Sequence, residues 1–405
     1  MKRYLKILGW VLLALFILTV PIGVNYVRYT VPLKTLPEAR LDHVVVQATG
    51  DLDLGVEASE LMRAYLESAS LPGVSAAVSR GDAAWAGAAG FADVGGAVPV
   101  SLTTSFRVGS TGKPLTALVL ARLFEEGRID LDTAIGTYKP DLPEHLHGIT
   151  PRQLASHTAG IRHYRLRDFN LYTLRKRTTA ENGLALFKDD DLVFPPGTGF
   201  SYSTYGYTLL GEVMAAALGS DFLSLLDREL IRAAGLSNTS PDYPDREVPD
   251  RTSFYTSGGG KYSSAPSQNV SYKWAGGGIV STPSDLIRVG QALLADDLIS
   301  EETRALFWTP VLLSDGSDNP QSYSLGWRYA ISTGLLGETR PTVMMHHGGR
   351  QVGGVSFYAI IPEYDVVVSV LSNTDDPEAR GAIQDLAYDL ARLAIDRETI
   401  PEAPQ

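Results

Sequence analysis

Apolar and small residues alternate near both ends of the chain, which is typical of β-strands. Residues 73–93 hold two such stretches on either side of the turn-like sequence Arg80-Gly81-Asp82, and they predict a hairpin. The C-terminal third contains four further β-rich segments, at residues 323–331, 343–346, 354–361 and 366–372.

Helical spacing prevails in the middle of the chain and at its end. Apolar residues recur every three or four positions at Leu115, Leu118, Val119 and Leu123. Gly127 provides a stop for this predicted helix. A second helix is predicted to begin at Thr282, with Pro283 at its first position and Asp285 at capping-box spacing. A final helix is predicted over residues 377–395.

Strands at both ends with helices between them predict an α+β fold, in which one mixed sheet is built from distant segments. We expect a globular domain over residues 48–405. Its sheet lobe would comprise about 53–115 and 322–397, and a helical lobe would be inserted at about 116–321. Such a body has a cleft between its two lobes.

The N-terminal segment reads as a membrane anchor. Basic residues at positions 2, 3 and 6 precede an uncharged, apolar run over residues 7–24, nearly long enough to span a bilayer. No small-residue cleavage site follows it, so we expect an uncleaved anchor and a stalk reaching residue 47. The basic flank predicts a cytoplasmic N-terminus and a single-pass protein with a periplasmic or extracellular domain. The alternative is a buried helix of the globular part.

Composition narrows the possible chemistry. The chain has 405 residues and a net charge of −11, which disfavours a nucleic-acid partner. It contains no cysteine, so disulfides, thiolate nucleophiles and Cys-ligated metals are excluded. Hydrophobic residues make up 44% of the chain, as in a packed globular protein.

Ser110-Thr111-Gly112-Lys113 is the only Ser-x-x-Lys in the sequence. On a helix these two side chains would share one face, so the Lys113 amine could take the proton of the Ser110 hydroxyl. That role requires a lysine whose pKa is lowered by burial or by neighbouring cations. A phosphate-binding loop is excluded, because Arg107 and Pro114 occupy positions where that motif needs Gly and Ser or Thr. Taken alone, Ser-x-x-Lys could be a chance pair on a solvated helix.

Two later segments could complete a site. Tyr202 follows a Pro-Pro-Gly turn and precedes an apolar helix, where its phenol could relay a proton, although it could equally be a packing aromatic. His346-His347-Gly348-Gly349 ends a predicted strand, and an amide there could stabilise an oxyanion. A tight turn or half of a metal site would give the same four residues.

The order Ser-x-x-Lys, Tyr-Ser-x, His-x-Gly resembles the serine β-lactamase and penicillin-binding family, in particular its class C and esterase-like branch. The sequence around these motifs also resembles the family, from about residue 54 to 394. It includes the segments SFRVGSTGKPLTALVLARLFEEGRIDLD and FPPGTGFSYSTYGYTLLGEV. The resemblance implies a mixed antiparallel sheet flanked by helices, with an inserted helical lobe.

The resemblance also implies roles for individual residues. Ser110 would be the acylated nucleophile, Lys113 its base and Tyr202 the partner in proton transfer. The amides of Ser110 and Gly349 would form the oxyanion hole, and Gly348 would lie on the same substrate-binding strand.

Two positions depart from the family pattern. Thr204 replaces an asparagine that would contact substrate, and His346 replaces a lysine. A neutral histidine would hold a β-lactam carboxylate poorly, so esters or peptides are the expected substrates.

We therefore expect a membrane-anchored serine hydrolase that acts on a small-molecule or peptide substrate. The alternatives are a D-Ala-D-Ala carboxypeptidase or transpeptidase, a weak β-lactamase, and an inactive binding or filament-forming protein that self-associates. No metal spacing is found, and no metal or other cofactor is expected. His145 and His147 are expected to be solvated and His157 to be structural, while the basic stretch 162–177 is either a lid or a solvated loop.

Overall fold

The computed structural model describes residues 33–165, 168, 180–243 and 247–396. The proposed anchor at 7–24 and most of the basic stretch 162–177 lie outside the described residues. Within these residues no single helix is long and apolar enough to cross a membrane. Thr204–Ala217 and Phe222–Ile231 meet such a criterion only as a pair bent by 84°.

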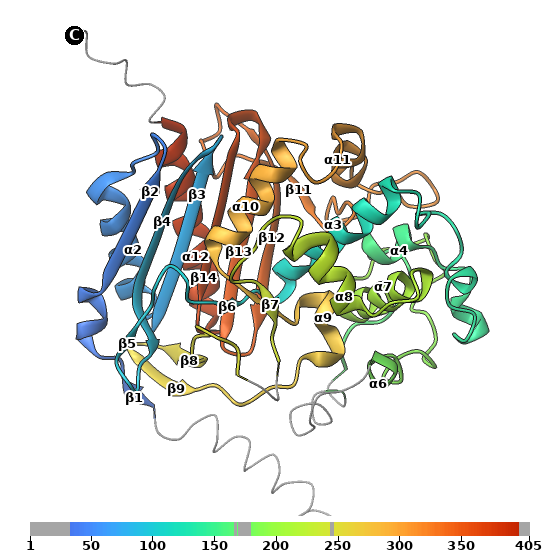
Figure 1. The fold of residues 1–405 in the computed structure, drawn as a ribbon, viewed down its shortest axis with the longest axis horizontal. Coiled ribbons are helices and arrows are strands. Elements are labelled where there is room, and N and C mark those ends of the chain that lie inside the picture. Colours follow the sequence, from blue (N-terminus) through green and yellow to red (C-terminus); the bar gives the residue numbers. More distant parts are fainter. Residues whose placement is uncertain (1–32, 166–167, 169–179, 244–246, 397–405) are drawn as a thin grey trace, which may run out of the picture.

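An antiparallel sheet of eight strands forms one side of the molecule (Figure 1). Its order is β11-β12-β13-β14-β3-β4-β2, and β5 pairs with β4. These strands are β2 (Val44–Thr49), β3 (Gly73–Arg80), β4 (Ala83–Asp93), β5 (Val98–Pro99), β11 (Arg328–Ser332), β12 (Thr342–Gln351), β13 (Gly354–Ile361) and β14 (Val366–Ser372). Segments from both ends of the chain therefore meet in one sheet, and the expected α+β class is confirmed.

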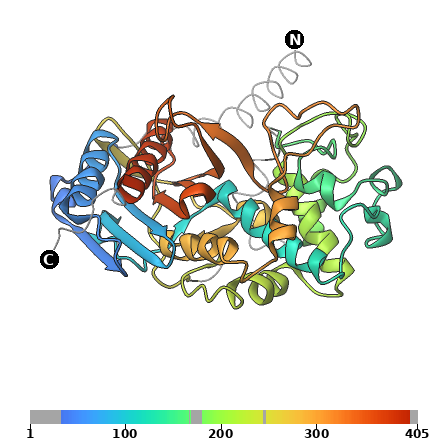
Figure 2. The same ribbon diagram turned by 90° about the horizontal axis from the view of Figure 1, so that it is seen from above.

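Helices cover both faces of this sheet. Helices α2 (Gly55–Ser68) and α12 (Pro377–Asp396) pack on one face, and α10 (Pro283–Leu294) packs on the other (Figure 2). Every residue of β14 is buried, with Val368 directed to the α12 side and Val367 to the α10 side. Burial on both faces explains why the central strands are hydrophobic throughout, whereas a strand with one solvated face would alternate.

The second lobe is mainly helical and occupies the other side of the molecule (Figure 1). Its helices are α3 (Gly112–Glu125), α4 (Pro151–Ala155), α6 (Ala180–Leu184), α7 (Thr204–Ala217), α8 (Phe222–Leu226), α9 (Trp274–Gly277) and α11 (Glu301–Trp308). The shorter helical turns across both lobes are η1 (Glu38–Asp42), η2 (Gly109–Thr111), η3 (Ile135–Thr137), η4 (Glu144–Leu146), the π-helical η5 (Asp227–Ile231), η6 (Ser271–Lys273) and η7 (Pro362–Tyr364).

Helix α10 begins as the sequence predicts but lies elsewhere than expected. The Thr282 side chain accepts a hydrogen bond from the Asp285 amide, and Pro283 occupies the first position. The Asp285 carboxylate accepts from the amide of Asn238, so only half of a capping box forms. The helix packs on β3 and β14, although it falls within the segment 116–321 expected to form the helical lobe.

Two small sheets complete the fold. One has the order β1-β9-β8 and the other β6-β10-β7. Their strands are β1 (Lys34–Thr35), β6 (Phe106–Arg107), β7 (Ser240–Pro241), β8 (Tyr255–Gly258), β9 (Lys261–Ser264) and β10 (Ile279–Ser281). The second of these sheets matters for the site, because β6 leads directly into η2.

Candidate active site

Ser110 lies in the turn η2, between β6 and the first residue of α3. The preceding residue, Gly109, has φ +52, a backbone conformation that residues with side chains rarely adopt. The Ser110 side chain is partly exposed and lines a cavity between the lobes. The helical spacing expected for Ser110 and Lys113 is realised as a 3-10 turn that continues into α3.

Glycines allow three segments to approach this turn closely. A Cβ atom added to Gly349 of β12 would lie 2.0 Å from the carbonyl oxygen of Val108. A Cβ atom added to Gly277 of α9 would lie 2.2 Å from the carbonyl oxygen of Gly109. Neither contact is possible for a larger residue without displacing backbone, so these glycines bring β12 and α9 against the Ser110 turn.

Lys113 is fully buried and reaches Ser110. Its Nζ lies 3.2 Å from Ser110 Oγ, 3.3 Å from Thr204 Oγ1 and 2.8 Å from the carbonyl oxygen of Gly276. The carbonyl can only accept a hydrogen bond, whereas each hydroxyl can donate or accept. A neutral amine can therefore donate to the carbonyl and accept a proton from the Ser110 hydroxyl.

The surroundings of Lys113 favour this neutral form. Burial lowers the pKa of Lys113 well below its ordinary value, because the charged amine loses its hydration. The cations of Lys273 and Arg328 lower it further. Lys273 is itself affected, since burial and Arg107 lower its pKa to about 8. No carboxylate forms an ion pair with Lys113 among the described residues, so no counter-charge there stabilises the protonated amine.

Tyr202 lies beside the lysine, just before α7. Lys113 Nζ lies 4.9 Å from the centroid of the Tyr202 ring. Burial raises the pKa of Tyr202 to about 12, although Ser110 and nearby cations oppose the increase, so the phenol is protonated at neutral pH. Its hydroxyl is buried and interacts with Ser110, which lowers the pKa of the phenol, and it has no other hydrogen-bond partner in the described part of the chain. A buried hydroxyl beside a candidate nucleophile can exchange a proton with a bound substrate.

Thr204 is buried beside Lys113. It is 4% exposed, its hydroxyl contacts Lys113, and its amide donates to His163 Nδ1 at 3.2 Å. The structure thus places this side chain against the amine and not among the groups that line the cavity, which differs from the substrate contact expected from the sequence.

The histidines of β12 are both neutral but have different surroundings. His346 lines the cavity, and burial together with Arg328 lowers its pKa to about 4. His347 is buried, and its Nδ1 donates to the carbonyl oxygen of Gly348 at 2.7 Å. Its Nε2 therefore accepts from the Tyr323 hydroxyl at 3.0 Å. His347 fixes the β12 segment, whereas His346 and Gly348 face the space above Ser110.

The cavity has a volume of about 340 Å³ and contains charges that sequence reasoning missed. Arg328, Arg350 and Arg380 all line it. Although His346 stands where the resemblance implies a lysine, cations therefore adjoin Ser110 in this cavity. Of the three, only Arg350 adjoins the motif at residues 346–349. Arg328 reaches the cavity because β11 pairs with β12, and Arg380 reaches it from α12. The remaining lining residues are Ser110, His163, Tyr202, His346, His347, Gly348, Gly349, Ser356, Phe357 and Gln384.

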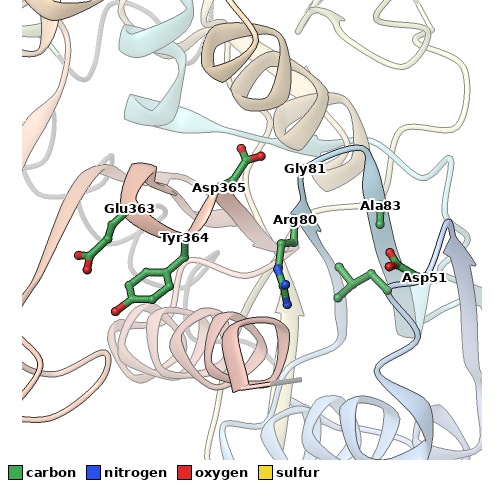
Figure 3. A pocket seen from close by; sticks show the side chains of 8 residues that line it. Asp51, Arg80, Gly81, Ala83, Glu363, Tyr364 and Asp365 are labelled. Atoms are coloured by element: carbon green, nitrogen blue, oxygen red, sulfur yellow. The ribbon is translucent and has the colours of Figure 1, made fainter. Parts of the chain in front are cut away.

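A larger cavity of about 470 Å³ lies where the β3–β4 and β13–β14 turns meet (Figure 3). It is lined by Asp51, Leu52, Arg80, Gly81, Ala83, Glu363, Tyr364 and Asp365. Its lining contains no pairing of a nucleophile with a base like that of Ser110 and Lys113. The candidate site is therefore identified by the contact of Ser110 with Lys113 and not by the size of its cavity.

His157 contacts the segment that carries Tyr202, which agrees with the structural role expected for it. Its Nδ1 accepts from the Ser203 amide at 3.1 Å, and its ring centroid lies 4.3 Å from that of Tyr202. It has φ +64, which is unusual for a residue with a side chain. His145 is exposed as expected, whereas His147 is half-buried and its Nε2 contacts the Leu142 carbonyl oxygen at 2.7 Å. Neither of them lines the cavity. No group of three His, Asp or Glu side chains suited to a metal occurs within the described residues.

Comparison with protein families agrees with this arrangement. The family model described as Beta-lactamase matches residues 58–393, which is most of the chain. The human serine beta-lactamase-like protein LACTB, mitochondrial, is 27% identical over 83% of this chain and 77% of its own length. The D-alanyl-D-alanine-carboxypeptidase/endopeptidase AmpH of Escherichia coli K12 is 25% identical over 67% of this chain and 71% of its own length.

A solved structure shows the same fold. The D-amino acid amidase of Ochrobactrum anthropi SV3 superposes with a TM-score of 0.71 and covers 86% of this chain and all of its own. Its sequence is 20% identical, so this likeness concerns the fold alone.

Proposed function

The chain belongs to the Beta-lactamase family and is a serine hydrolase, and from that premise we propose that it cleaves amide or ester bonds through an acyl-enzyme on Ser110. The observation that carries the assignment is the contact of 3.2 Å between Lys113 Nζ and Ser110 Oγ, together with the burial of the lysine.

Acylation begins with proton transfer. Neutral Lys113 takes the proton of Ser110 as Oγ attacks the carbonyl carbon, and the carbonyl oxygen becomes an oxyanion. The amides of Ser110 and Gly349 donate to that oxygen, which is supported by the close packing of β12 on η2. Tyr202 gives its proton to the leaving nitrogen or oxygen and recovers one from Lys113. The bond to the leaving group then breaks and Ser110 carries the acyl group.

Deacylation follows the same route with water as the nucleophile. Lys113 and Tyr202 draw a proton from the water as its oxygen attacks the ester carbon. The oxyanion forms again at the same two amides, and its collapse returns a proton to Ser110 Oγ. The products are a carboxylic acid and the free enzyme.

Peptides are the substrates that we favour. AmpH, a relative in sequence, is named as a carboxypeptidase and endopeptidase. The arginines of the cavity could hold the carboxylate of a β-lactam. We therefore also expect penicillin to acylate Ser110 and to be released slowly. We further propose that residues 7–24 anchor the domain to a membrane, with the domain outside the cytoplasm.

A fluorophosphonate probe tests the nucleophile. It should label the wild-type chain and a Ser317→Ala control, which changes an exposed loop serine. Ser110→Ala should not be labelled. Labelling that persists in Ser110→Ala would exclude the assignment. An unlabelled wild-type chain that forms filaments in electron micrographs would favour the inactive, self-associating alternative.

A further inference from the structure

The cavity above Ser110 has a charge opposite to that of the whole chain. Arg328 reaches it from β11, Arg350 from β12 and Arg380 from α12. No Asp or Glu is found among the described residues that line it, although the chain carries a net charge of −11. Because the three arginines come from two paired strands and a helix, the fold itself concentrates positive charge at this point.

The three guanidinium groups are not held in ion pairs among the described residues. Arg350 Nε donates to the backbone carbonyl of Asp375 at 3.2 Å, and Arg328 donates to the side-chain amide oxygen of Gln321. The Asp375 carboxylate accepts from the Thr256 hydroxyl at 3.1 Å; burial raises its pKa, and the nearby charge of Arg350 opposes that increase. Three cations that share one carboxylate neighbour and form no ion pair leave an excess of positive charge at a concave site, which attracts an anionic ligand.

Their position relative to Tyr202 indicates which part of a substrate they meet. The Arg328 guanidinium carbon lies 5.6 Å from the centroid of the Tyr202 ring. Arg328 is also paired across the sheet with His346. In the proposed mechanism Tyr202 protonates the departing group, so that group must lie on the Tyr202 side of Ser110. Arg328 therefore faces the leaving group, and Arg380, whose charge also opposes the rise in the pKa of Tyr202, acts on the same side of the cavity.

The number of arginines indicates how many negative charges a matching ligand would carry. One guanidinium can bind one carboxylate with two parallel hydrogen bonds. Three guanidiniums with no carboxylate partner thus exceed what a single carboxylate requires. Arg380 and Gln384 lie one helical turn apart on α12, so an amide donor stands beside one of the cations. A cavity of about 340 Å³ accommodates a group of amino-acid size.

We infer that the preferred leaving group is an amino acid with two carboxylates, such as a C-terminal glutamate released from a peptide. This inference rests on the proposed serine peptidase activity. In the reaction the amide C–N bond breaks, the nitrogen gains a proton by way of Tyr202, and water later supplies the oxygen and proton that complete the acid. The site is thus a carboxypeptidase site for acidic residues.

Three substrates of nearly equal size test this inference. They are N-acetylglycyl-glutamate, N-acetylglycyl-glutamine and N-acetylglycyl-glutamine amide, prepared with each enantiomer of the terminal residue. Their leaving groups carry two, one and no carboxylates. For the wild-type chain kcat/KM should fall about tenfold with each carboxylate removed, as expected for loss of a charge-assisted hydrogen bond.

Substitution of the arginines should remove the preference. Arg350 and Arg380 are exposed, so Arg350→Gln and Arg380→Gln should fold, which thermal unfolding checks. Each should reduce the ratio of kcat/KM for the glutamate and glutamine peptides about tenfold, and Arg380→Lys should restore part of it. Arg288→Gln, on the exposed side of α10 and outside the cavity, is the matched control and should keep the wild-type ratio.

The outcomes separate the inference from the function on which it rests. Equal kcat/KM for the three peptides, or no cleavage by a chain that a fluorophosphonate still labels on Ser110, would overturn the inference alone. Absence of both cleavage and labelling would overturn the proposed function as well.

Discussion

Lys113 brings together the features that distinguish a base from an ordinary surface lysine. It is buried, it contacts the Ser110 hydroxyl, and its neighbours Lys273 and Arg328 are cations. Burial and the two cations disfavour a charged amine, and the contact with Ser110 gives the neutral amine a proton to accept. Activity should therefore need the neutral form and should fall as pH decreases through the lowered pKa of Lys113.

Lys273→Met tests the electrostatic part of this explanation. Removal of the second cation should raise the pKa of Lys113, because one repulsive charge is lost. The acid limb of the kcat/KM profile should then move to higher pH, with little change in its plateau. Lys261→Met, an exposed lysine of β9, is the control. An acid limb that stays in place would show that Lys273 does not influence the base.

Tyr202→Phe should separate catalysis from stability. The hydroxyl is buried and its one hydrogen-bonding interaction among the described residues is with Ser110, so its removal should change the melting temperature little. Proton transfer to the leaving group is lost, and kcat should fall by about 100-fold or more. Steady-state kinetics and thermal unfolding measure the two effects. A variant with lower stability and full activity would contradict the role assigned to Tyr202.

At the scale of elements, the close contact between β12 and η2 determines where an oxyanion can bind. Gly349→Ala would place a Cβ atom 2.0 Å from the Val108 carbonyl oxygen and 2.1 Å from Ser356 Oγ. It should destabilise the fold by about 1–3 kcal/mol, as overpacking does. Gly348→Ala is the matched comparison, because its nearest atom lies at 3.9 Å. Denaturant unfolding should separate the two variants, and equal free energies of unfolding would contradict the close packing.

Part of the sheet lobe was predictable from sequence, whereas β2, which lies largely in the expected stalk, and α2 were not predicted. The strands 354–361 and 366–372 were predicted with the bounds that the structure has, because hydrophobic runs end abruptly at the polar residues of a turn. The Thr282 cap was predictable because Pro283 and the capping hydroxyl act within one turn of helix. The packing of α10 on the sheet depends on distant contacts, and the local pattern does not contain them.

The same distinction applies to the site. The meeting of Ser110 and Lys113 follows from a spacing of three residues and a helical turn. The three arginines have no such signature, since Arg328 is brought in by pairing with β12 and Arg380 by the packing of α12 on β13 and β14. Their shared cavity could be recognised only in three dimensions.

For the whole molecule, two lobes built from distant segments enclose the cavity above Ser110. The described residues begin at 33, and the first strand among them, β1, pairs with β9. We expect a chain truncated to residues 33–405 to remain in the soluble fraction and to react with a fluorophosphonate. The full chain should sediment with membranes and resist a carbonate wash. Extraction of the full chain by that wash would contradict the anchor.

Acylation of Ser110 is measured directly by rapid-quench mass spectrometry with a p-nitrophenyl ester. The wild-type chain should release a burst of one nitrophenol per chain. The peptide that contains Ser110 should gain the mass of the acyl group, and Ser110→Ala should show neither signal. Turnover without a burst or adduct in the wild-type chain, or an adduct on another residue, would contradict acylation of Ser110.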